Sequence, residues 1–350
     1  MSQPLILAID TSCDETCAAV SHGRKILSNV ISSQINIHSP YGGVVPNLAK
    51  RAHQDKIDWV VRESLKRSHL VSKQETTFPV NAIAVTIGPG LAPALEVGVN
   101  FAKNLALKYK KPLIAINHLE GHLLSSLALP NTPGVNLQFP ALGLIASGGH
   151  TQLILVKKIG SYQLLGETLD DAAGESLDKL AKMLKLGYPG GPIIEKLAKL
   201  GNPDVIPLPI PMQHSKDFNF SFSGLKTAAM YKIKTVGSVL TIKFTQDMAA
   251  SFQQAITKSL TIKLQKAIDR FQPKSILIGG GVFSNLYFRS QIRTIARKNS
   301  LPFHQPYSQK LFTDNAAMIA VAASFHFNKG ESFVKNIHRL DRQPNLNFTI

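Results

Sequence analysis

The strongest constraint on the fold of this chain is an order of predicted strands and helices that occurs twice. Three short apolar runs open the chain at Leu5–Asp10, Thr16–Ser21 and Lys25–Gln34, and helical and apolar segments then alternate. Three more such runs lie between residues 141 and 168, and they too are followed by helices and a further strand at Ser275–Ile278. Meandering strands followed by alternating helices and strands predict a mixed sheet flanked by helices. The sequence therefore predicts two copies of one α/β unit.

Two copies of such a unit predict a duplicated actin-like (ASKHA) fold, as in actin-like ATPases and sugar kinases. We expect a first lobe over residues 1–137 and a second over residues 138–314, with a central cleft for a nucleotide-like ligand. A last helix, at about residues 315–345, is expected to pack back on the first lobe. A chain of 350 residues is long enough to build a hydrophobic core in each lobe.

The composition is that of a globular protein with a strongly basic surface. Hydrophobic residues make up 44% of the chain, and the formal net charge is +17. Such a charge attracts polyanions, so nucleic acid is an expected partner. Two cysteines do not build a disulfide framework, and no apolar stretch reaches membrane-spanning length. We therefore expect a cytoplasmic protein with no membrane partner.

Two histidines in the segment His118-Leu119-Glu120-Gly121-His122 are spaced for one face of a helix. With the distant Asp314 they would give a metal two imidazoles and one carboxylate, leaving positions for water or substrate. A zincin carries its glutamate directly after the first histidine, whereas Glu120 is the second residue after His118. The alternative is that the histidines only pack a helix and that Asp314 is the N-cap of the last helix.

Four turns follow predicted strands or precede predicted helices, and each is rich in glycine or in acidic and hydroxyl residues. They are Asp10–Thr16, Ser147–Thr151, Tyr188–Pro192 and Gly279–Asn285. Glycine lets backbone N–H groups approach an anionic oxygen closely, and the free N–H groups at the start of a helix can hold phosphate. Ordinary turn and hairpin chemistry would also explain each turn taken alone.

Taken together, these segments closely resemble the TsaD (Gcp/YgjD) family of tRNA N6-adenosine threonylcarbamoyltransferases. The matching blocks occur in the family's order over nearly the whole chain. They are Ile9–Thr16, Tyr41–Pro46, Gly88–Gly90, Asn117–His122, Ser147–Leu153, Asp170–Lys179, Tyr188–Pro192, Phe220–Thr227, Gly279–Asn285 and Thr313–Ile319.

The resemblance implies an actin-like fold with a metal ion in the cleft. It implies that His118, His122 and Asp314 bind this divalent metal, with Fe²⁺ favoured and Zn²⁺ as the other candidate. It also implies a set of residues that hold threonylcarbamoyl-AMP. These are Ile145, Ala146, Ser147, Gly148, Gly149, Asp178, Gly191, Glu195 and Asn285.

The activity implied is transfer of the threonylcarbamoyl group from threonylcarbamoyl-AMP to the N6 amine of the adenosine 3′ of the anticodon (position 37). The substrates would be tRNAs that read codons beginning with A, and AMP would leave. Asp14 or Glu15 could accept the amine proton, which makes them the candidate catalytic residues. If the protein is bacterial, the family's helper proteins are a paralogous actin-like subunit (TsaB-like) and a small ATPase (TsaE-like).

Two positions depart from the family pattern: Asn47 stands where an acid is usual, and Asp10 replaces a glutamate. Two rival functions remain open from the residues alone. A metal-dependent peptidase would use the histidine pair but has its glutamate in the wrong place. A sugar-kinase-like ATPase would use the fold but leaves the metal group unexplained.

Overall fold

The computed structural model describes residues 3–70, 78–129, 137–237 and 239–348 of the chain. Its internal contacts divide the protein into two compact units. The first unit comprises Met1–Asn136 together with Gln305–Ile350, and the second comprises Leu137–His304. Residues 305–314 were expected in the second lobe, but they belong to the first unit. The physical reason is that Leu311 and Phe312 are buried and lead directly into a helix packed on the first sheet.

A five-stranded mixed sheet forms the centre of the first unit, in the order β3-β2-β1-β4-β5. The strands β1, β2 and β3 form an antiparallel meander, and β4 and β5 add parallel to β1. The elements of this unit are β1 (Leu5–Asp10), β2 (Glu15–His22), β3 (Lys25–Ser33), α1 (Ile35–His38), α2 (Pro46–Arg67), β4 (Ala82–Gly88), α3 (Ala92–Tyr109), β5 (Leu113–Asn117), α4 (His118–Leu124) and α10 (Ala316–Lys329).

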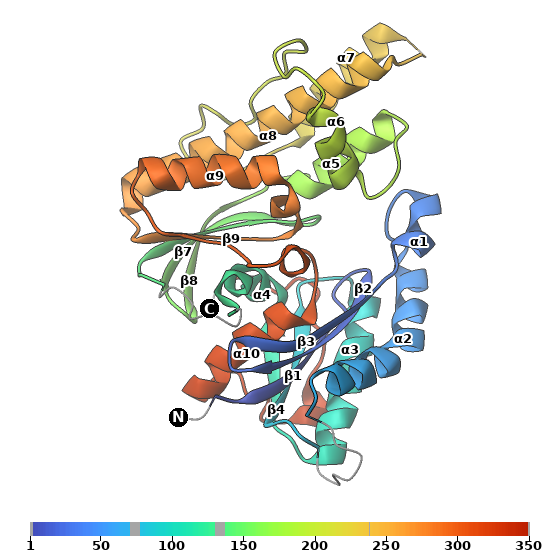
Figure 1. Ribbon diagram of the computed structural model, residues 1–350, viewed down its shortest axis with the longest axis vertical. Helices are drawn as coiled ribbons and strands as arrows, with labels where there is room; N and C mark the ends of the chain where they lie inside the picture. Colours follow the sequence, from blue (N-terminus) through green and yellow to red (C-terminus); the bar gives the residue numbers. More distant parts are fainter. Residues whose placement is uncertain (1–2, 71–77, 130–136, 238, 349–350) are drawn as a thin grey trace. The chain divides into compact units, whose positions relative to one another are not determined.

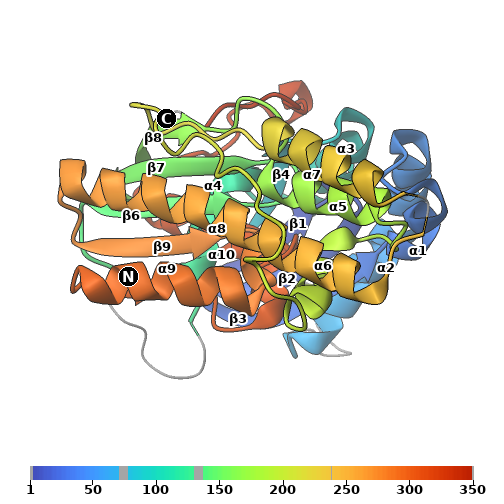
Figure 2. The ribbon, with the colours of Figure 1, turned by 90° about the horizontal axis from the view of Figure 1, so that it is seen from above.

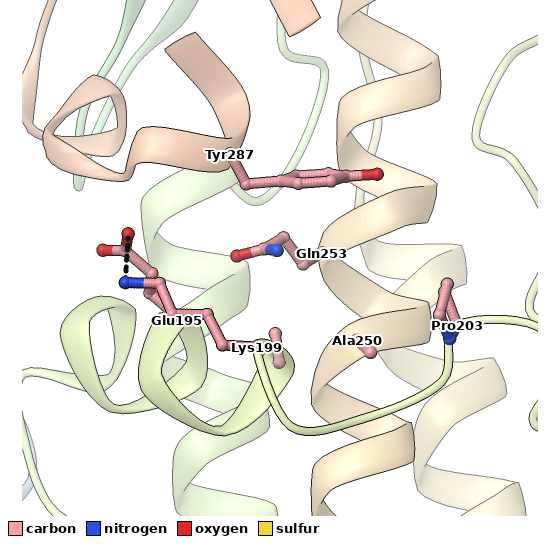
Figure 3. Close-up of a pocket in the computed structure, with 7 residues that line it drawn as sticks. Glu195, Lys199, Pro203, Ala250, Gln253 and Tyr287 are labelled. Carbon is pink, nitrogen blue, oxygen red and sulfur yellow. Dashed lines mark ion pairs between the residues drawn. The ribbon is translucent and has the colours of Figure 1, made fainter. Parts of the chain in front are cut away.

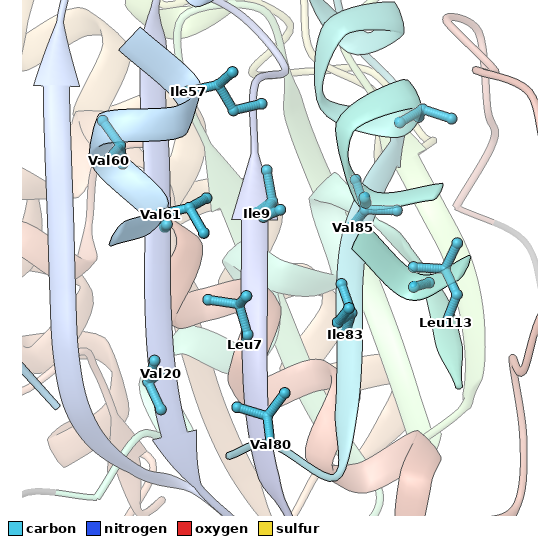
Figure 4. Packing of buried hydrophobic residues seen from close by; sticks show 14 of the residues in the cluster. Leu7, Ile9, Val20, Ile57, Val60, Val61, Val80, Ile83, Val85 and Leu113 are labelled. Atoms are coloured by element: carbon cyan, nitrogen blue, oxygen red, sulfur yellow. The ribbon is translucent and has the colours of Figure 1, made fainter. Parts of the chain in front are cut away.

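Apolar side chains from α2 and α3 pack on one face of this sheet (Figure 4). Leu7 and Ile9 alternate along β1, and they join Val61 of α2 in one buried cluster. Alternate residues of a strand point to opposite faces, so Ile6 and Ala8, which are also buried, point to the other face. The strand β1 is therefore covered on both sides, which explains its unbroken apolar run.

The helix α10 packs against β1, β2, β3 and α4. Its first nine residues, 316–324, are all buried, so it is a core helix rather than a surface helix. The helix was expected to extend to about residue 345 but ends at Lys329. Gly330 follows with a φ of 70°, the left-handed conformation that commonly ends helices. Beyond it the chain continues without a long helix, and Val334 donates a hydrogen bond to Leu113 of β5.

The second unit repeats the sheet of the first. Its order β10-β9-β6-β7-β8 corresponds strand for strand, read from the opposite end, to that of the first sheet. Again an antiparallel meander is extended by two parallel strands. Its elements are β6 (Ala141–Ala146), β7 (Thr151–Lys158), β8 (Ser161–Glu167), α5 (Ala173–Met183), α6 (Gly190–Ala198), α7 (Ser223–Val236), α8 (Ile242–Phe271), β9 (Ser275–Gly279), α9 (Leu286–Lys298) and β10 (Phe303–His304).

Helices α8 and α9 lie on the same side of this second sheet (Figures 1 and 2). The long helix α8 begins where Thr241 accepts a hydrogen bond from the N–H of Phe244. Residues 202–222, which include four prolines, contain no helix, and they lead into the helix α7, which was not predicted. Asp170 contacts the start of α7 from another part of the chain, since it accepts hydrogen bonds from the backbone N–H groups of Phe222 and Ser223.

The predicted duplication is therefore confirmed: each unit has the actin-like mixed sheet, and the predicted strands agree with the observed ones to within a few residues. Within the described ranges, no helix has both the length and the apolar character needed to span a bilayer.

Candidate functional site

Three side chains of the first unit that were predicted as metal ligands lie close together. His118, His122 and Asp314 each offer one ligand atom, and these atoms all lie within 4.8 Å of one another. The Oδ1 atom of Asp314 is 3.1 Å from Nε2 of His122 and 3.7 Å from Nε2 of His118. The two rings are edge to face, with centroids 4.6 Å apart. This group could hold one metal ion.

The two histidines are placed by the short helix α4. Asn117 caps this helix, because its side-chain oxygen accepts a hydrogen bond of 2.8 Å from the N–H of Leu119. The cap starts the helix at His118 itself, so His118 and His122 stand one turn apart on one face. Gly121 lets the helix lie close to α10: a β-carbon there would be 2.7 Å from Cδ1 of Ile319.

Asp314 does not cap the last helix, contrary to the alternative drawn from the sequence. The N-cap is Asn315, whose side-chain oxygen accepts a hydrogen bond of 3.1 Å from the N–H of Met318. Asp314 precedes the cap, and its carbonyl oxygen accepts a weak hydrogen bond from the thiol of Cys17 at 3.7 Å. Its carboxylate is therefore directed toward the histidines rather than required by the helix.

The fit of these residues to a metal can be judged from their own unsatisfied atoms. Both ring nitrogens of His122 and Nδ1 of His118 are buried and make no well-directed hydrogen bond within the described ranges. Nε2 of His122 has only the Asp314 carboxylate at 3.1 Å, and Nδ1 of His118 has only the Asp10 carboxylate at 3.5 Å. Buried polar atoms are normally paired, and leaving one unpaired is costly. Imidazole nitrogens together with one carboxylate suit Zn²⁺ or Fe²⁺. The donor set therefore fits a divalent transition metal.

Burial and the nearby carboxylates shift the pKa values of the two histidines in opposite directions. Burial lowers the pKa of His118, but the carboxylates of Asp314 and Asp10 outweigh it and raise this pKa to about 9. Burial is the largest influence on His122 and lowers its pKa, against the opposing effect of Asp314. The two histidines are therefore inequivalent, although they lie on one helix face.

Asp10 is a residue of this site that sequence reasoning placed in the Asp10–Thr16 turn and noted as a departure from the family pattern, but did not assign to the metal group. It is buried at the end of β1, and its Oδ2 lies 3.5 Å from Nδ1 of His118. A carboxylate behind the far nitrogen of a ligating histidine fixes the ring's orientation and raises its basicity. The sequence feature that could have identified Asp10 was its position at the carboxyl end of a predicted central strand.

Glu120 is directed away from the group. Its Oε2 lies 2.9 Å from Nε2 of His326 on α10, and both residues are buried. A metallopeptidase needs its glutamate beside the metal-bound water, so the contact with His326 does not support that rival.

The two candidate catalytic acids lie in the turn and strand that follow β1. Asp14 is buried, whereas Glu15, at the start of β2, accepts a hydrogen bond from Ser33. Burial raises the pKa of Glu15 well above its usual value, and the charges of Asp14 and Asp314 raise it further. Glu15 is thus a stronger proton acceptor than an exposed glutamate.

In the second unit the predicted Ser147-Gly148-Gly149 turn joins β6 to β7 and lies against the start of α5. Gly174 donates its N–H to the carbonyl oxygen of Ser147, and Glu175 donates to that of Gly148. A β-carbon on Gly148 or Gly149 would meet no protein atom within 4 Å, and neither glycine has a positive φ. Neither the backbone conformation nor protein packing therefore requires glycine at these two positions.

The next predicted residues continue from α5 to α6. Asp178 on α5 accepts a hydrogen bond of 2.7 Å from the N–H of Gly190, which fixes the turn before α6. A β-carbon on Gly190 would be 2.6 Å from that of Ala181, so this glycine is needed for packing. Its neighbour Gly191 is different, because a β-carbon there would meet nothing within 4 Å.

Glu195 and Asn285 are brought together at the start of α9. Glu195 accepts a hydrogen bond of 3.1 Å from the N–H of Leu286 and pairs with Lys199 at 3.3 Å. Asn285 caps α9 through the N–H of Tyr287 and donates a hydrogen bond of 2.6 Å to Gln253. Ile145 and Ala146 lie beside this region on β6, since a β-carbon on Gly280 would meet the carbonyl oxygen of Ala146.

A cavity of about 120 Å³ opens beside Glu195 within the second unit. Figure 3 shows the ring of Tyr287 on one side, the amide of Gln253 directed toward the space, and the carboxylate of Glu195 paired with Lys199. The cavity is lined by Glu195, Ala198, Lys199, Pro203, Ala250, Gln253 and Tyr287. Of the residues predicted to hold the adenylate, only Glu195 is part of this lining.

Comparison with known proteins gives one consistent result. Residues 25–321 match the TsaD family, described as tRNA N6-adenosine threonylcarbamoyltransferase. Relatives with this name include those of Thermosipho melanesiensis, 44% identical over 98% of this chain and 99% of the relative, and of Bacillus subtilis, 41% identical over 98% and 96%. The relative from a Cyanothece species is 46% identical over 93% of both chains.

Solved structures support the fold alone. The chain is similar to HypF of T. kodakarensis, with a TM-score of 0.57 and 14% identity over 94% of this chain and 48% of that one. A full-length HypF in a phosphate- and nucleotide-bound form gives a TM-score of 0.56 and 13% identity over 93% of this chain and 56% of that one. Both likenesses agree with the duplicated actin-like architecture.

Proposed function

This chain belongs to the TsaD family of tRNA N6-adenosine threonylcarbamoyltransferases, and we propose that it transfers a threonylcarbamoyl group from threonylcarbamoyl-AMP to tRNA. The acceptor is the N6 amine of the adenosine 3′ of the anticodon, in tRNAs that read codons beginning with A, and AMP is released. The observation that carries this proposal is the family match over residues 25–321 together with the convergence of His118, His122 and Asp314.

His118, His122 and Asp314 hold one divalent metal in this proposal, with Fe²⁺ as the favoured ion and Zn²⁺ as the alternative. The Nε2 atoms of both histidines, which face the carboxylate of Asp314, support that assignment. A bound metal supplies a Lewis acid and a fixed point for orienting phosphate or carbonyl oxygens. The role of Asp10 is to orient the ring of His118 from behind.

The second unit holds the donor. The backbone N–H groups of Ser147, Gly148 and Gly149 can approach an anionic oxygen closely. The backbone of Gly191 can do so at the start of α6. The open space beside these glycines supports this role, because protein packing does not explain them. Their partners in holding the adenylate are the remaining residues of the predicted set, which are Ile145, Ala146, Asp178, Glu195 and Asn285.

The acceptor amine is a weak nucleophile, because its lone pair is delocalised into the adenine ring. The donor is a mixed anhydride and is already activated, so the main tasks of the protein are alignment and charge neutralisation. Asp14 and Glu15 are the candidate groups to accept the amine proton. The raised pKa of the Glu15 carboxyl supports such a role, since a stronger base takes a proton more readily.

The proposed partners and cellular location follow from membership of the family. The tRNA is the macromolecular substrate, and the net charge of +17 favours its approach. The proposed helper proteins, if the chain is bacterial, are a TsaB-like actin-like subunit and a TsaE-like ATPase. The proposed location is the cytoplasm, where tRNA is found.

The test is a reconstituted reaction. The protein, loaded with Fe²⁺, is incubated with threonylcarbamoyl-AMP, the helper proteins and an unmodified tRNA that reads an A-starting codon. Nucleoside mass spectrometry should detect one threonylcarbamoyl adenosine per tRNA, with an equal amount of AMP. The absence of that nucleoside from a reaction containing loaded protein and all partners would refute the proposal.

A further inference from the structure

One long segment of the second unit contains basic residues but no acidic residues. Residues 270–304 contain six lysines and arginines and no aspartate or glutamate. The whole chain, by comparison, has 39 basic and 22 acidic residues. This segment includes the end of α8, the strands β9 and β10, and the whole of α9.

Three arginines form a row along α9. Phe288, Ile292 and Ala296 recur every four residues and make the buried side of this helix. Each is followed directly by an arginine, so Arg289, Arg293 and Arg297 form a second row beside the buried one. Successive members of the row are separated by about 6 Å along the helix axis.

The surroundings of the first two arginines partly disfavour positive charge. Arg289 lies in the first turn of α9, where the helix dipole disfavours a cation. Burial lowers the pKa of Arg289, and the charge of Arg293 lowers it further. Like charges so placed repel one another, whereas Arg297 in the last turn is favoured by the dipole. Arg289 and Arg293 thus place two positive charges one turn apart, and the charge of Glu195 favours that on Arg289.

The row begins at the proposed donor site of this same unit. Asn285 caps α9, and Glu195 contacts the N–H of Leu286 at the first residue of the helix. Glu195 is also the acid that acts on Arg289. A polyanion lying along the row would therefore reach the residues that are proposed to hold the adenylate.

We propose that the α9 arginine row, Arg289, Arg293 and Arg297, binds the phosphate backbone of the substrate tRNA. This inference rests on the proposed function, because that function makes tRNA the polyanion that must approach the donor. Arginine suits the task, since its planar guanidinium presents two parallel donors to a phosphate. Arg293 is additionally held over the ring of Phe303, with 5.6 Å from its guanidinium carbon to the ring centroid.

The experiment compares direct tRNA binding by the wild-type full chain and three variants of it. Arg289→Gln with Arg293→Gln removes two charges from the row, and Arg289→Lys with Arg293→Lys keeps them. A matched control, Lys157→Gln with Lys158→Gln, removes two exposed charges from β7 in the same unit. The affinity for unmodified tRNA is measured over a series of salt concentrations, and thermal unfolding is recorded for every form.

The glutamine variant should bind tRNA on the order of ten-fold more weakly, and the slope of log affinity against log salt should fall by about two. The lysine variant should recover most of the slope, and the β7 control should behave as wild type. The thermal midpoints separate a loss of tRNA affinity from a loss of folding.

Equal affinities and slopes for the glutamine variant and the β7 control would overturn the proposal, and so would an absence of tRNA binding by the wild-type protein. A loss of tRNA affinity confined to the glutamine variant supports it even if the wild-type protein forms no threonylcarbamoyl adenosine, in which case only the proposed function fails. Normal tRNA binding by the glutamine variant would also count against the proposal. It would leave an acidic protein as the alternative partner of the α9 arginine row.

Discussion

Glu120 Oε2 and His326 Nε2 lie 2.9 Å apart in the core of the first unit, and this contact joins α4, which bears two candidate metal ligands, to α10, which follows the third. His118 and His122 stand on either side of Glu120 in α4, while Asp314 lies just before α10, which carries His326. The far nitrogen of His326 is 3.0 Å from the hydroxyl oxygen of Ser332. The distance between the histidine pair and Asp314 therefore depends in part on a contact on the opposite face of α4.

We expect Glu120→Ala to weaken metal binding as well as the fold. The variant leaves a buried imidazole nitrogen without its partner, which should lower the free energy of unfolding by about 2–3 kcal/mol. The metal affinity, measured by competition with a chelator, should also fall, whereas Glu120→Gln should restore part of it.

The control for this prediction is Ser64→Ala, which breaks a buried 2.8 Å hydrogen bond to Ser28 in the same unit. It should lower stability without changing metal affinity. If Glu120→Ala kept wild-type metal affinity despite its lower stability, the contact would be structural only.

Asp314 and Asn315 are neighbours with separable tasks, and exchanging each for alanine should show this. Asp314→Ala should abolish stoichiometric metal binding with little loss of stability, because Asn315 is the helix cap. Asn315→Ala should cost about 1 kcal/mol of stability, as a lost cap does, and retain the metal. Elemental analysis after dialysis, together with thermal unfolding, measures both. Full metal content in both Asp314→Ala and the pair His118→Ala with His122→Ala would rule out this site.

Adjacent glycines at the start of α6 provide a similar test of the donor site. Gly191→Val should fold normally, because a β-carbon at this position meets no protein atom within 4 Å. It should weaken binding of a non-hydrolysable adenylate analogue by roughly ten-fold or more, since the ligand must approach this backbone closely. Calorimetric titration measures the affinity.

Gly190→Ala is the matched comparison for Gly191→Val. Its new β-carbon would lie 2.6 Å from that of Ala181 and 2.8 Å from the Cα of Asp178. Overpacking of this kind costs about 1–3 kcal/mol, so this variant should lose stability first. Unchanged analogue affinity in a stable Gly191→Val protein would assign the turn a structural role alone.

Much of this fold and of the metal group could be predicted from local sequence patterns. The spacing of His118 and His122 places them on one helix face in any regular helix, and the repeated strand order determines the sheet topology. The contacts of Asp10 and Glu120 could not be predicted in this way. They depend on how α4 packs against α10 and how His118 approaches the end of β1, which are distant in the sequence.

The ends of the last helix also required the structure. An aspartate and an asparagine are both good N-caps, so Asp314-Asn315 left the start ambiguous until Asn315 was seen to accept the hydrogen bond from Met318. The helix α7 escaped prediction because its pattern is weak: only Leu225 and Ala229 are buried along its length.

The pH dependence of stability should report on His53, which is buried in the first unit beside the candidate catalytic turn. Its Nε2 lies 2.9 Å from the carbonyl oxygen of Cys13, and its Nδ1 lies 2.8 Å from the hydroxyl oxygen of Thr16. A carbonyl oxygen can only accept, so Nε2 carries the hydrogen and the neutral ring accepts from Thr16. Burial lowers the pKa of His53 below its usual 6.5, although the bond to Cys13 opposes that effect.

A lowered pKa means that the unfolded chain binds a proton to His53 more readily than the folded protein does. Stability should therefore be unaffected by this group above pH 6.5 and should fall as the pH drops below that value. In metal-free protein, His53→Gln should show a smaller fall in thermal midpoint between pH 7.5 and pH 5.5 than wild type. The exposed His22 gives the control, since His22→Gln should leave the fall unchanged. An equal fall in wild type and His53→Gln would mean that His53 is not the group that titrates.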